Sequence, residues 1–161
     1  MAEGIVRAVQ QRIDPACVIH GRLVKAGCRI SLRDAPVRRL VLDFDKPEAP
    51  SRPGGGRCDF LLVAENYKNS NWVAPLECKK GALNASKVVR QLRDGAAIAE
   101  DVVPSERDFE FRPIAAVGSV PKLERSRLKK PGNLIECRGK REAVRLIKCG
   151  DRFVTRLTKR E

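Results

Sequence analysis

The sequence predicts an α/β fold in which a mixed β-sheet is flanked by helices. Two short apolar runs, residues 58–64 (CDFLLVA) and 72–79 (WVAPLECK), have the length and composition of buried strands. A third such run covers residues 113–119, and a helical stripe of apolar residues precedes it. Strands that alternate with a helix in this way are typical of a sheet with helices packed against it.

The N-terminal part is expected to contain one short helix and two strands. Apolar residues recur at helical spacing over residues 3–13, and Asp14-Pro15 ends the pattern. Residues 27–33 and 39–45 have strand patterns separated by turn-forming Asp34-Ala35-Pro36, so we expect a hairpin there. Residues 47–56, rich in proline and glycine, are expected to form a loop.

A long helix is expected between Asn84 and Val103. Its apolar stripe consists of Val88, Leu92, Ala96, Ala99 and Val103. Asn84 or Ser86 is suited to the N-cap position, and Pro104 ends the helix. After the strand at 113–119 we expect a basic helix over residues 121–130 and two further strands at 133–137 and 142–149.

The length of 161 residues and the hydrophobic content of 42% predict one domain over residues 1–161, with a core at about 1–119 and a basic extension at 120–161. No apolar stretch approaches the roughly 18 to 20 residues of a membrane span, and the N-terminus has no hydrophobic signal segment. We therefore expect no membrane partner and a cytoplasmic location.

Six cysteines are scattered through apolar runs, which predicts buried thiols rather than a disulfide framework. Cys17, His20 and Cys28 have part of the spacing of a zinc site, but a second close pair is missing.

The net charge of +13 favours a polyanionic partner, and nucleic acid is the first expectation. Residues 120–161 contain 14 basic and 5 acidic residues, a net charge of +9. The alternative is a basic surface that only keeps the protein soluble. The lysines and arginines expected to contact phosphates are Lys80, Lys87, Lys122, Arg125, Arg127, Lys129 and Lys130.

The candidate chemistry lies at the ends of the two apolar runs. Because side chains alternate along a strand, Glu77 and Lys79 share one face. If the two runs pair, Asp59 approaches Glu77, and two carboxylates with one ammonium suit Mg²⁺ or Mn²⁺. Such an ion can activate water and neutralise charge during phosphodiester hydrolysis.

Asp59, the later Glu77-Cys78-Lys79 and a helix carrying Gln91 resemble the PD-(D/E)XK (restriction-endonuclease-like) nuclease superfamily. The resemblance covers residues 57–103 and implies an αβββαβ core. It further implies that Asp59, Glu77 and the Cys78 carbonyl bind the metal, that Lys79 is the catalytic lysine and that Gln91 assists. The implied activity is Mg²⁺-dependent (or Mn²⁺-dependent) endonuclease cleavage of DNA, with a homodimer as a possible assembly.

Several residues depart from this pattern. The proline expected before the first acid is replaced by Arg57-Cys58, and Pro75 removes a hydrogen-bond donor inside a strand. Some branches take an acid from the first helix, for which Glu3 is the candidate. Asp43 and Asp45 could add a ligand, although exposure to solvent is the expected environment for both.

Three other interpretations remain open. Glu77, Lys79 and Lys80 could form a solvated strand end, with Asp59 a loop acid. The chain could be a non-catalytic module of the same fold that binds nucleic acid or protein, or a basic RNA-associated protein. A nuclease should bind a divalent metal through Asp59 and Glu77, whereas a solvated strand end or a non-catalytic module should not. RNA binding without turnover would indicate an RNA-associated protein.

Overall fold

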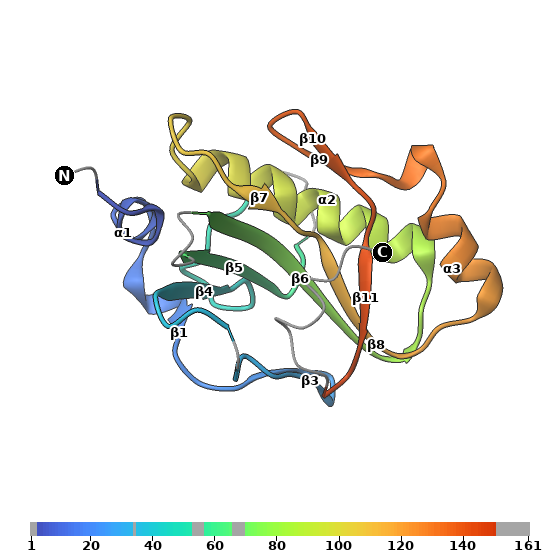
Figure 1. The fold of residues 1–161 in the computed structure, drawn as a ribbon. Coiled ribbons are helices and arrows are strands. Elements are labelled where there is room, and N and C mark those ends of the chain that lie inside the picture. Colours follow the sequence, from blue (N-terminus) through green and yellow to red (C-terminus); the bar gives the residue numbers. More distant parts are fainter. Residues whose placement is uncertain (1–2, 34, 53–56, 66–69, 151–161) are drawn as a thin grey trace.

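A seven-stranded mixed β-sheet forms the centre of the molecule, and helices pack against it (Figure 1). The computed structural model describes residues 3–33, 35–52, 57–65 and 70–150. The α/β class and the mixed, helix-flanked sheet predicted from the sequence are confirmed. The glycines at 54–56, Asp34 and the end of the basic tail lie outside the described residues.

The helices are α1 (Ile5–Gln10), α2 (Ala85–Val102) and α3 (Lys122–Leu128), with 3-10 turns at Pro15–Cys17 and Pro131–Asn133. The strands are β1 (Val18–Ile19), β2 (Leu23–Lys25), β3 (Cys28–Ile30), β4 (Arg39–Asp43), β5 (Phe60–Glu65), β6 (Asn71–Ala82), β7 (Glu110–Phe111), β8 (Ile114–Ser119), β9 (Ile135–Cys137), β10 (Lys140–Glu142) and β11 (Arg145–Lys148).

The main sheet has the order β1-β4-β5-β6-β8-β11, with β7 also paired to β6. Strands β4, β5 and β6 are antiparallel neighbours, whereas β6, β8 and β11 run parallel. Parallel neighbours need a crossover, and α2 supplies it between β6 and β8. Strand β11 adds the last main-sheet strand, so part of the segment expected as an extension belongs to the sheet.

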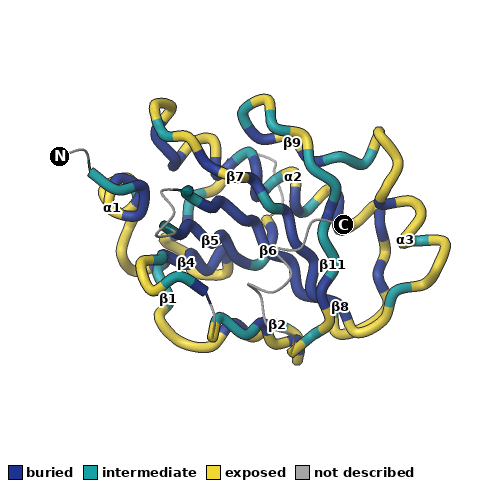
Figure 2. The backbone as a smooth tube through the Cα atoms, viewed as in Figure 1, coloured by how far each residue is buried: buried dark blue, intermediate teal, exposed yellow. Residues whose placement is uncertain are grey.

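The two faces of the sheet are covered differently. Buried residues of α1, α2 and α3 pack against one face, together with Leu61, Val63 and Val73. The β2–β3 hairpin packs against the other face, over Phe60 and Leu76. Strands and the inner side of α2 are buried, while α3 is largely exposed (Figure 2).

The predicted pairing of residues 27–33 with 39–45 is wrong. Strand β3 pairs with β2, and β4 pairs with β1 and β5. The two-residue turn of the β2–β3 hairpin uses Ala26 and Gly27, both at positive φ (49° and 76°). Positive φ at both positions is what the tightest hairpin turns require, and Ala-Gly is not among the pairs that signal such a turn in a sequence.

The long helix is confirmed almost to the residue. The Asn84 side chain accepts a hydrogen bond from the backbone N–H of Lys87, so it is the N-cap. Pro75 lies between Val73, which pairs with β7, and Leu76, which pairs with β8. Pro75 has no backbone N–H to donate. It lies at the point where the neighbour of β6 changes from β7 to β8, so the missing donor falls between the two ladders.

Four of the six cysteines are buried thiols, as expected: Cys17, Cys58, Cys78 and Cys137. Cys28 and Cys149 instead form a disulfide that joins β3 to the end of β11. The sequence did not predict this disulfide, because spacing in the sequence cannot report a pairing across 121 residues. No helix in the described ranges is long and apolar enough to cross a membrane.

Candidate active site

Strands β5 and β6 bring the two predicted acids together. Phe60 pairs with Leu76, and the backbone N–H of Asp59 donates to the Leu76 carbonyl at 3.0 Å. Asp59 therefore lies at the entry of β5, beside Glu77. Its carboxylate also accepts a hydrogen bond from the backbone N–H of Cys78 at 2.8 Å. This bond ties the first acid to the backbone between Glu77 and Lys79.

Glu77 and Lys79 lie on the face of the sheet that α2 covers. Leu76 and Cys78 belong to the apolar cluster beneath the β2–β3 hairpin, so their odd-numbered neighbours face the other way. Glu77 is only 2% exposed, whereas Lys79 is half-buried. The interpretation of a solvated strand end is therefore wrong for Glu77.

The carboxyl groups of Asp59 and Glu77 are close enough to hydrogen-bond to each other. The pKa of Glu77 is raised to about 8, first by burial and then by the charge of Asp59 and the hydrogen bond between the two carboxyl groups, against the lowering effect of Lys79. Burial also raises the pKa of Asp59, although the Cys78 N–H and the Glu77 hydrogen bond act in the opposite direction. The pair consequently retains one proton near neutral pH when nothing else compensates its charge.

Gln91 lies one helical turn before Gly95, on the side of α2 that packs against the sheet. A Cβ atom at Gly95 would be 2.4 Å from Sγ of Cys58 and 3.0 Å from Cβ of Pro75, so α2 touches the sheet there. Helix α2 runs back along β6. Gln91 is one helical turn, about 6 Å, before Gly95 in α2. Glu77 is two strand residues, about 7 Å, after Pro75 in β6. Because the two elements run in opposite directions, these offsets bring Gln91 to about the level of Glu77.

Two oxygen atoms in this region lack a hydrogen-bond partner. They are Oε2 of Glu77 and Oε1 of Gln91, and both are buried. Buried acceptors are normally paired, because leaving one unpaired costs about 1 to 3 kcal/mol. Both atoms are acceptors, so a ligand that brings positive charge or a hydrogen-bond donor would satisfy them.

The donor set fits a hard divalent cation. Within the described ranges, no group of three or more His, Cys, Asp or Glu side chains is assembled for a metal. Mg²⁺ needs fewer, since it commonly binds through one or two carboxylates and fills its shell with water and substrate phosphate. Asp59 and Glu77 meet that requirement, and the Cys78 carbonyl lies between Glu77 and Lys79 on the same strand.

The basic residues predicted to contact phosphates are divided between two sides of the molecule. Lys80 packs along the β2–β3 turn, since a Cβ at Gly27 would be 3.0 Å from its Cδ. It therefore faces away from Glu77. Lys87 is exposed in the first turn of α2. The others lie in or directly after α3: Lys122, Arg125, Arg127, Lys129 and Lys130.

Helix α3 is fixed beside the start of α2. Oε2 of Glu124 accepts a hydrogen bond from the backbone N–H of Ala85 at 3.1 Å, and Oε1 of the same residue pairs with Arg127 at 3.0 Å. Arg127 is thus partly neutralised. Lys122, Arg125 and Lys129 are exposed along this helix and its C-terminal end.

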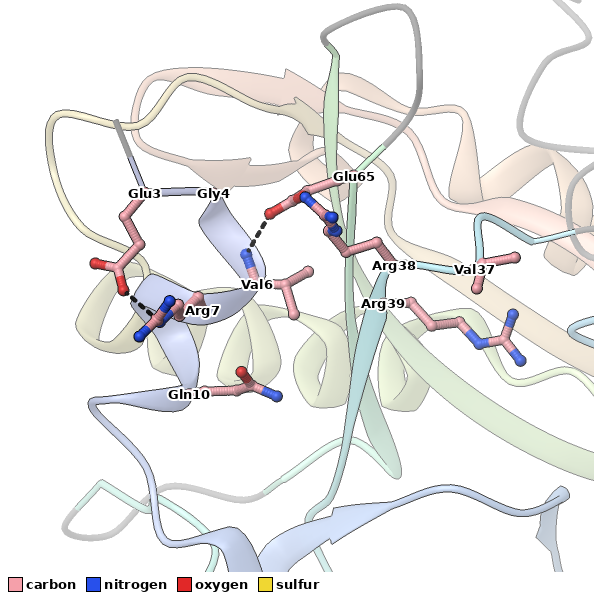
Figure 3. Close-up of a pocket in the computed structure, with 9 residues that line it drawn as sticks. All are labelled: Glu3, Gly4, Val6, Arg7, Gln10, Val37, Arg38, Arg39 and Glu65. Atoms are coloured by element: carbon pink, nitrogen blue, oxygen red, sulfur yellow. Dashed lines mark hydrogen bonds and ion pairs between the residues drawn. The ribbon is translucent and has the colours of Figure 1, made fainter. Parts of the chain in front are cut away.

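Glu3 does not reach the acids. It forms an ion pair with Arg7 at 3.2 Å and lines a cavity between α1 and β4 (Figure 3). Glu65, at the far end of β5 from Asp59, lines the same cavity and accepts from the backbone N–H of Val6. The six residue steps from Asp59 to Glu65 span roughly 20 Å of strand, so Glu3 is not a ligand of this site.

The other alternative ligands are also elsewhere. Cys28 is in the disulfide and Cys17 is buried in the core, so the predicted fragment of a zinc site is not assembled. Asp43 is 9% exposed, contrary to the expected solvent exposure, while Asp45 is exposed as expected. Their positions differ because Asp43 is still within β4.

One charged residue near the acids had no signal in the sequence. Nζ of Lys25 lies 2.7 Å from Oδ1 of Asp43 and 2.6 Å from Oδ2 of Asp45. Lys25 also lowers the pKa of Asp59, whereas Asp45 raises it. Only the β2–β3 hairpin brings Lys25 to this position, and that hairpin was not predicted.

Comparison with protein-family models, curated proteins and solved structures returns no match for this chain. The resemblance of residues 57–103 to a nuclease superfamily therefore stays a prediction. The α/β architecture, the mixed sheet and the meeting of Asp59 with Glu77 are observations of the structure itself.

Proposed function

We propose that this protein is a metal-dependent nuclease that hydrolyses phosphodiester bonds of nucleic acid, with DNA as its substrate. One observation carries the proposal: two acidic side chains meet at a sheet position where Lys79 shares their face and two buried oxygens lack partners. A divalent cation would satisfy those oxygens. The net charge of +13 supports a polyanionic substrate.

In this proposal Asp59 and Glu77, with the Cys78 carbonyl, hold Mg²⁺ or Mn²⁺. The bound ion would polarise the phosphate and make water more acidic. Asp59 is oriented by the Cys78 N–H, and this fixes its position without the ion. Gln91, with its buried Oε1 on the sheet side of α2, would supply an amide group to orient a ligand water.

Lys79 has the role of stabilising charge. Lys79 is half-buried on the same face as Glu77, and its charge lowers the pKa of that acid, so its ammonium lies near the proposed metal site. Lysine can neutralise negative charge that grows on phosphorus oxygens, or orient the attacking water. Removing the Lys79 ammonium should lower kcat more than it raises KM, because the negative charge on the phosphorus oxygens develops in the transition state.

A homodimer is part of the proposal. One site cuts one strand at a time, so cleavage of both strands of a duplex at one place is simplest with two chains. Light scattering after size-exclusion chromatography, with and without duplex DNA, distinguishes monomer from dimer.

Incubation with DNA substrates and Mg²⁺ or Mn²⁺ tests the proposal. Linear, nicked, branched and single-stranded forms are compared for wild type, Glu77→Gln and Lys79→Met. The matched controls are Glu136→Gln, exposed on β9, and Arg7→Met, exposed beside Glu3 near the far end of β5. Cleavage lost in the first pair and retained in the controls supports the proposal. No cleavage of any form, together with no melting shift on addition of Mn²⁺, would instead support a non-catalytic module.

A further inference from the structure

The disulfide between Cys28 and Cys149 lies against the backbone of the strand that carries Glu77 and Lys79. Both cysteines pack in the apolar cluster beneath the β2–β3 hairpin, on the face of the sheet opposite these two side chains. Sγ of Cys149 is 3.7 Å from the carbonyl oxygen of Lys79, and Sγ of Cys28 is 3.5 Å from the carbonyl oxygen of Ala116. The disulfide therefore touches β6 directly behind the proposed site.

The backbone of β6 becomes irregular at the same point. Strands β6 and β8 are paired in register up to Lys79, and the register shifts before the next pair, at Ala82. The two strands approach closely there, since a Cβ added at Gly118 would collide with the carbonyl oxygen of Lys80. An irregularity of this kind can redirect the side chain beside it. The direction of the Lys79 side chain thus depends on a segment that regular sheet pairing does not hold.

The disulfide connects this segment to the β2–β3 hairpin and to the end of β11 (Figure 1). Beside it, the backbone N–H of Gly150 donates to the carbonyl of Arg29 at 2.6 Å, and the backbone N–H of Cys149 donates to the carbonyl of Val117 at 3.1 Å. Strands β3, β8 and β11 therefore all meet β6 at the two sulfur atoms.

Opening the disulfide should change this junction locally. Two thiol sulfurs cannot stay at bonding distance, so they move apart, and the Lys79 carbonyl that one of them touches must move or repack. The hairpin itself remains attached, because Leu23 and Ile30 are buried in the apolar cluster on the sheet. The expected effect is a shift of the irregular segment of β6 in a chain that stays folded.

We propose that the Cys28–Cys149 disulfide is a redox switch that sets the position of Lys79: the oxidised chain cleaves, and reduction by a dithiol slows cleavage. This regulation rests on the proposed function. Reduction begins at Cys149, because this residue is half-buried whereas Cys28 is fully buried, and thiol exchange depends on access to the sulfur that is attacked.

The exchange has two steps. One thiolate of the dithiol attacks Sγ of Cys149, forms a mixed disulfide and releases Sγ of Cys28 as a thiolate, which takes up a proton. The second thiolate of the dithiol then attacks the dithiol's own sulfur in the mixed disulfide and releases Sγ of Cys149, which is protonated in turn. The chain gains two electrons and two protons, and the dithiol becomes a disulfide. Oxidised glutathione reverses the reaction.

Cleavage of duplex DNA with Mg²⁺ by oxidised and reduced full-length chain tests the switch. Dithiothreitol reduces the protein and is removed without air before the assay, which is run well below the Tm of the reduced chain. Reduction should lower kcat about 10-fold or more with little change in KM, since a catalytic group misplaced by about 1 Å can cost on the order of 100-fold. Oxidised glutathione should restore the rate. Equal rates before and after reduction would overturn the proposal.

Two cysteine variants identify the sulfur atoms responsible. Cys28→Ala/Cys149→Ala should have a low kcat that does not respond to dithiothreitol. The matched control is Cys137→Ala, which removes a buried thiol on β9, and it should respond like the wild type. A double variant that still responds to dithiothreitol would place the switch at another thiol and contradict the proposal.

Lys79→Met separates the switch from a general loss of stability. Because the disulfide acts through the position of Lys79, the oxidised and reduced forms of this variant should cleave at equal, low rates. A fall on reduction by the same factor as in the wild type would contradict this route.

Hydrogen exchange reports the switch without cleavage. Reduction should speed exchange of the backbone amides of residues 78–83 more than that of amides in α2. If both redox forms of the wild type cleave alike, the switch fails and the nuclease proposal stands. If no chain cleaves, the nuclease proposal fails. Faster exchange at residues 78–83 then retains the disulfide as a conformational switch, whereas unchanged exchange rules out both.

Discussion

The Asp59 carboxylate accepts a hydrogen bond at 2.8 Å from the backbone N–H of Cys78, the residue between Glu77 and Lys79. This contact joins the start of one strand to the middle of its neighbour. It places two carboxyl groups against each other in a buried position, where both resist ionisation. The stability of the protein and its affinity for cations should therefore depend on the same pair.

The stability of the metal-free protein should fall as the pH rises. The pKa of Glu77 is raised from 4.5 to about 8, so in that window the folded protein retains a proton that the unfolded chain has lost. The unfolded state then binds fewer protons, and the free energy of unfolding decreases with pH by on the order of a few kcal/mol. Urea unfolding below and above this window, with a chelator present, measures it. Glu77→Gln should flatten the dependence. A wild-type stability that rises over the same range would refute the assignment.

Divalent cations should stabilise the protein through the same two acids. A cation at 100 times its Kd adds about 2.7 kcal/mol to the free energy of unfolding. Because the ion displaces the shared proton, its affinity should increase as the pH approaches 8. Thermal melts with and without Mn²⁺ measure the shift in Tm. Asp59→Asn and Glu77→Gln should abolish the shift, and Glu136→Gln should retain it. An equal shift in all three variants would place the ion elsewhere.

Gly95→Ala should destabilise the protein, although alanine is the better helix former by about 1 kcal/mol. The added methyl would lie 2.4 Å from Sγ of Cys58, which cannot move away without disturbing the strand beside Asp59. Overpacking of this kind costs about 1 to 3 kcal/mol. Gly132→Ala, where no atom lies within 4 Å, is the neutral control.

A second substitution tests the cause of that loss. Cys58→Ala removes the sulfur, so the double variant with Gly95→Ala should be more stable than the sum of the single effects predicts. Urea unfolding of the four chains gives this coupling. Strict additivity would mean that the contact with Cys58 is not the cause.

Reduction of the Cys28–Cys149 disulfide should lower stability by roughly 3 to 5 kcal/mol, because the bond closes a long loop in the unfolded chain. Unfolding curves with and without reductant measure the change. Cys28→Ala/Cys149→Ala should match the reduced wild type and should not respond to reductant. Identical curves for oxidised and reduced wild type would show that the bond does not form.

The sequence predicted the elements whose signals are local. The stripe from Val88 to Val103 and the cap at Asn84 define α2, and the apolar runs define β5 and β6. The alternation along β6 also predicted that Glu77 and Lys79 share a face. These signals depend on neighbouring residues, so they survive in a single sequence.

The features that the sequence did not predict depend on distant partners. The pairing of β3 with β2 follows from Ala26-Gly27, a pair with weak turn preference. The depth of burial of Asp43, its ion pair with Lys25 and the disulfide of Cys28 all follow from where that hairpin packs. The cavity between β8, β11 and α3 likewise requires the addition of β11 to the sheet.

The most direct test of the central claim is cleavage of DNA by the purified protein with Mg²⁺ or Mn²⁺, quantified for wild type, Asp59→Asn, Glu77→Gln and Lys79→Met. The account predicts metal-dependent product from the wild type, abolished by a chelator and reduced at least about 100-fold in each variant, as the loss of one transition-state contact does. Product formed equally well by the wild type and the three variants, or none with any substrate form and either ion, would contradict it.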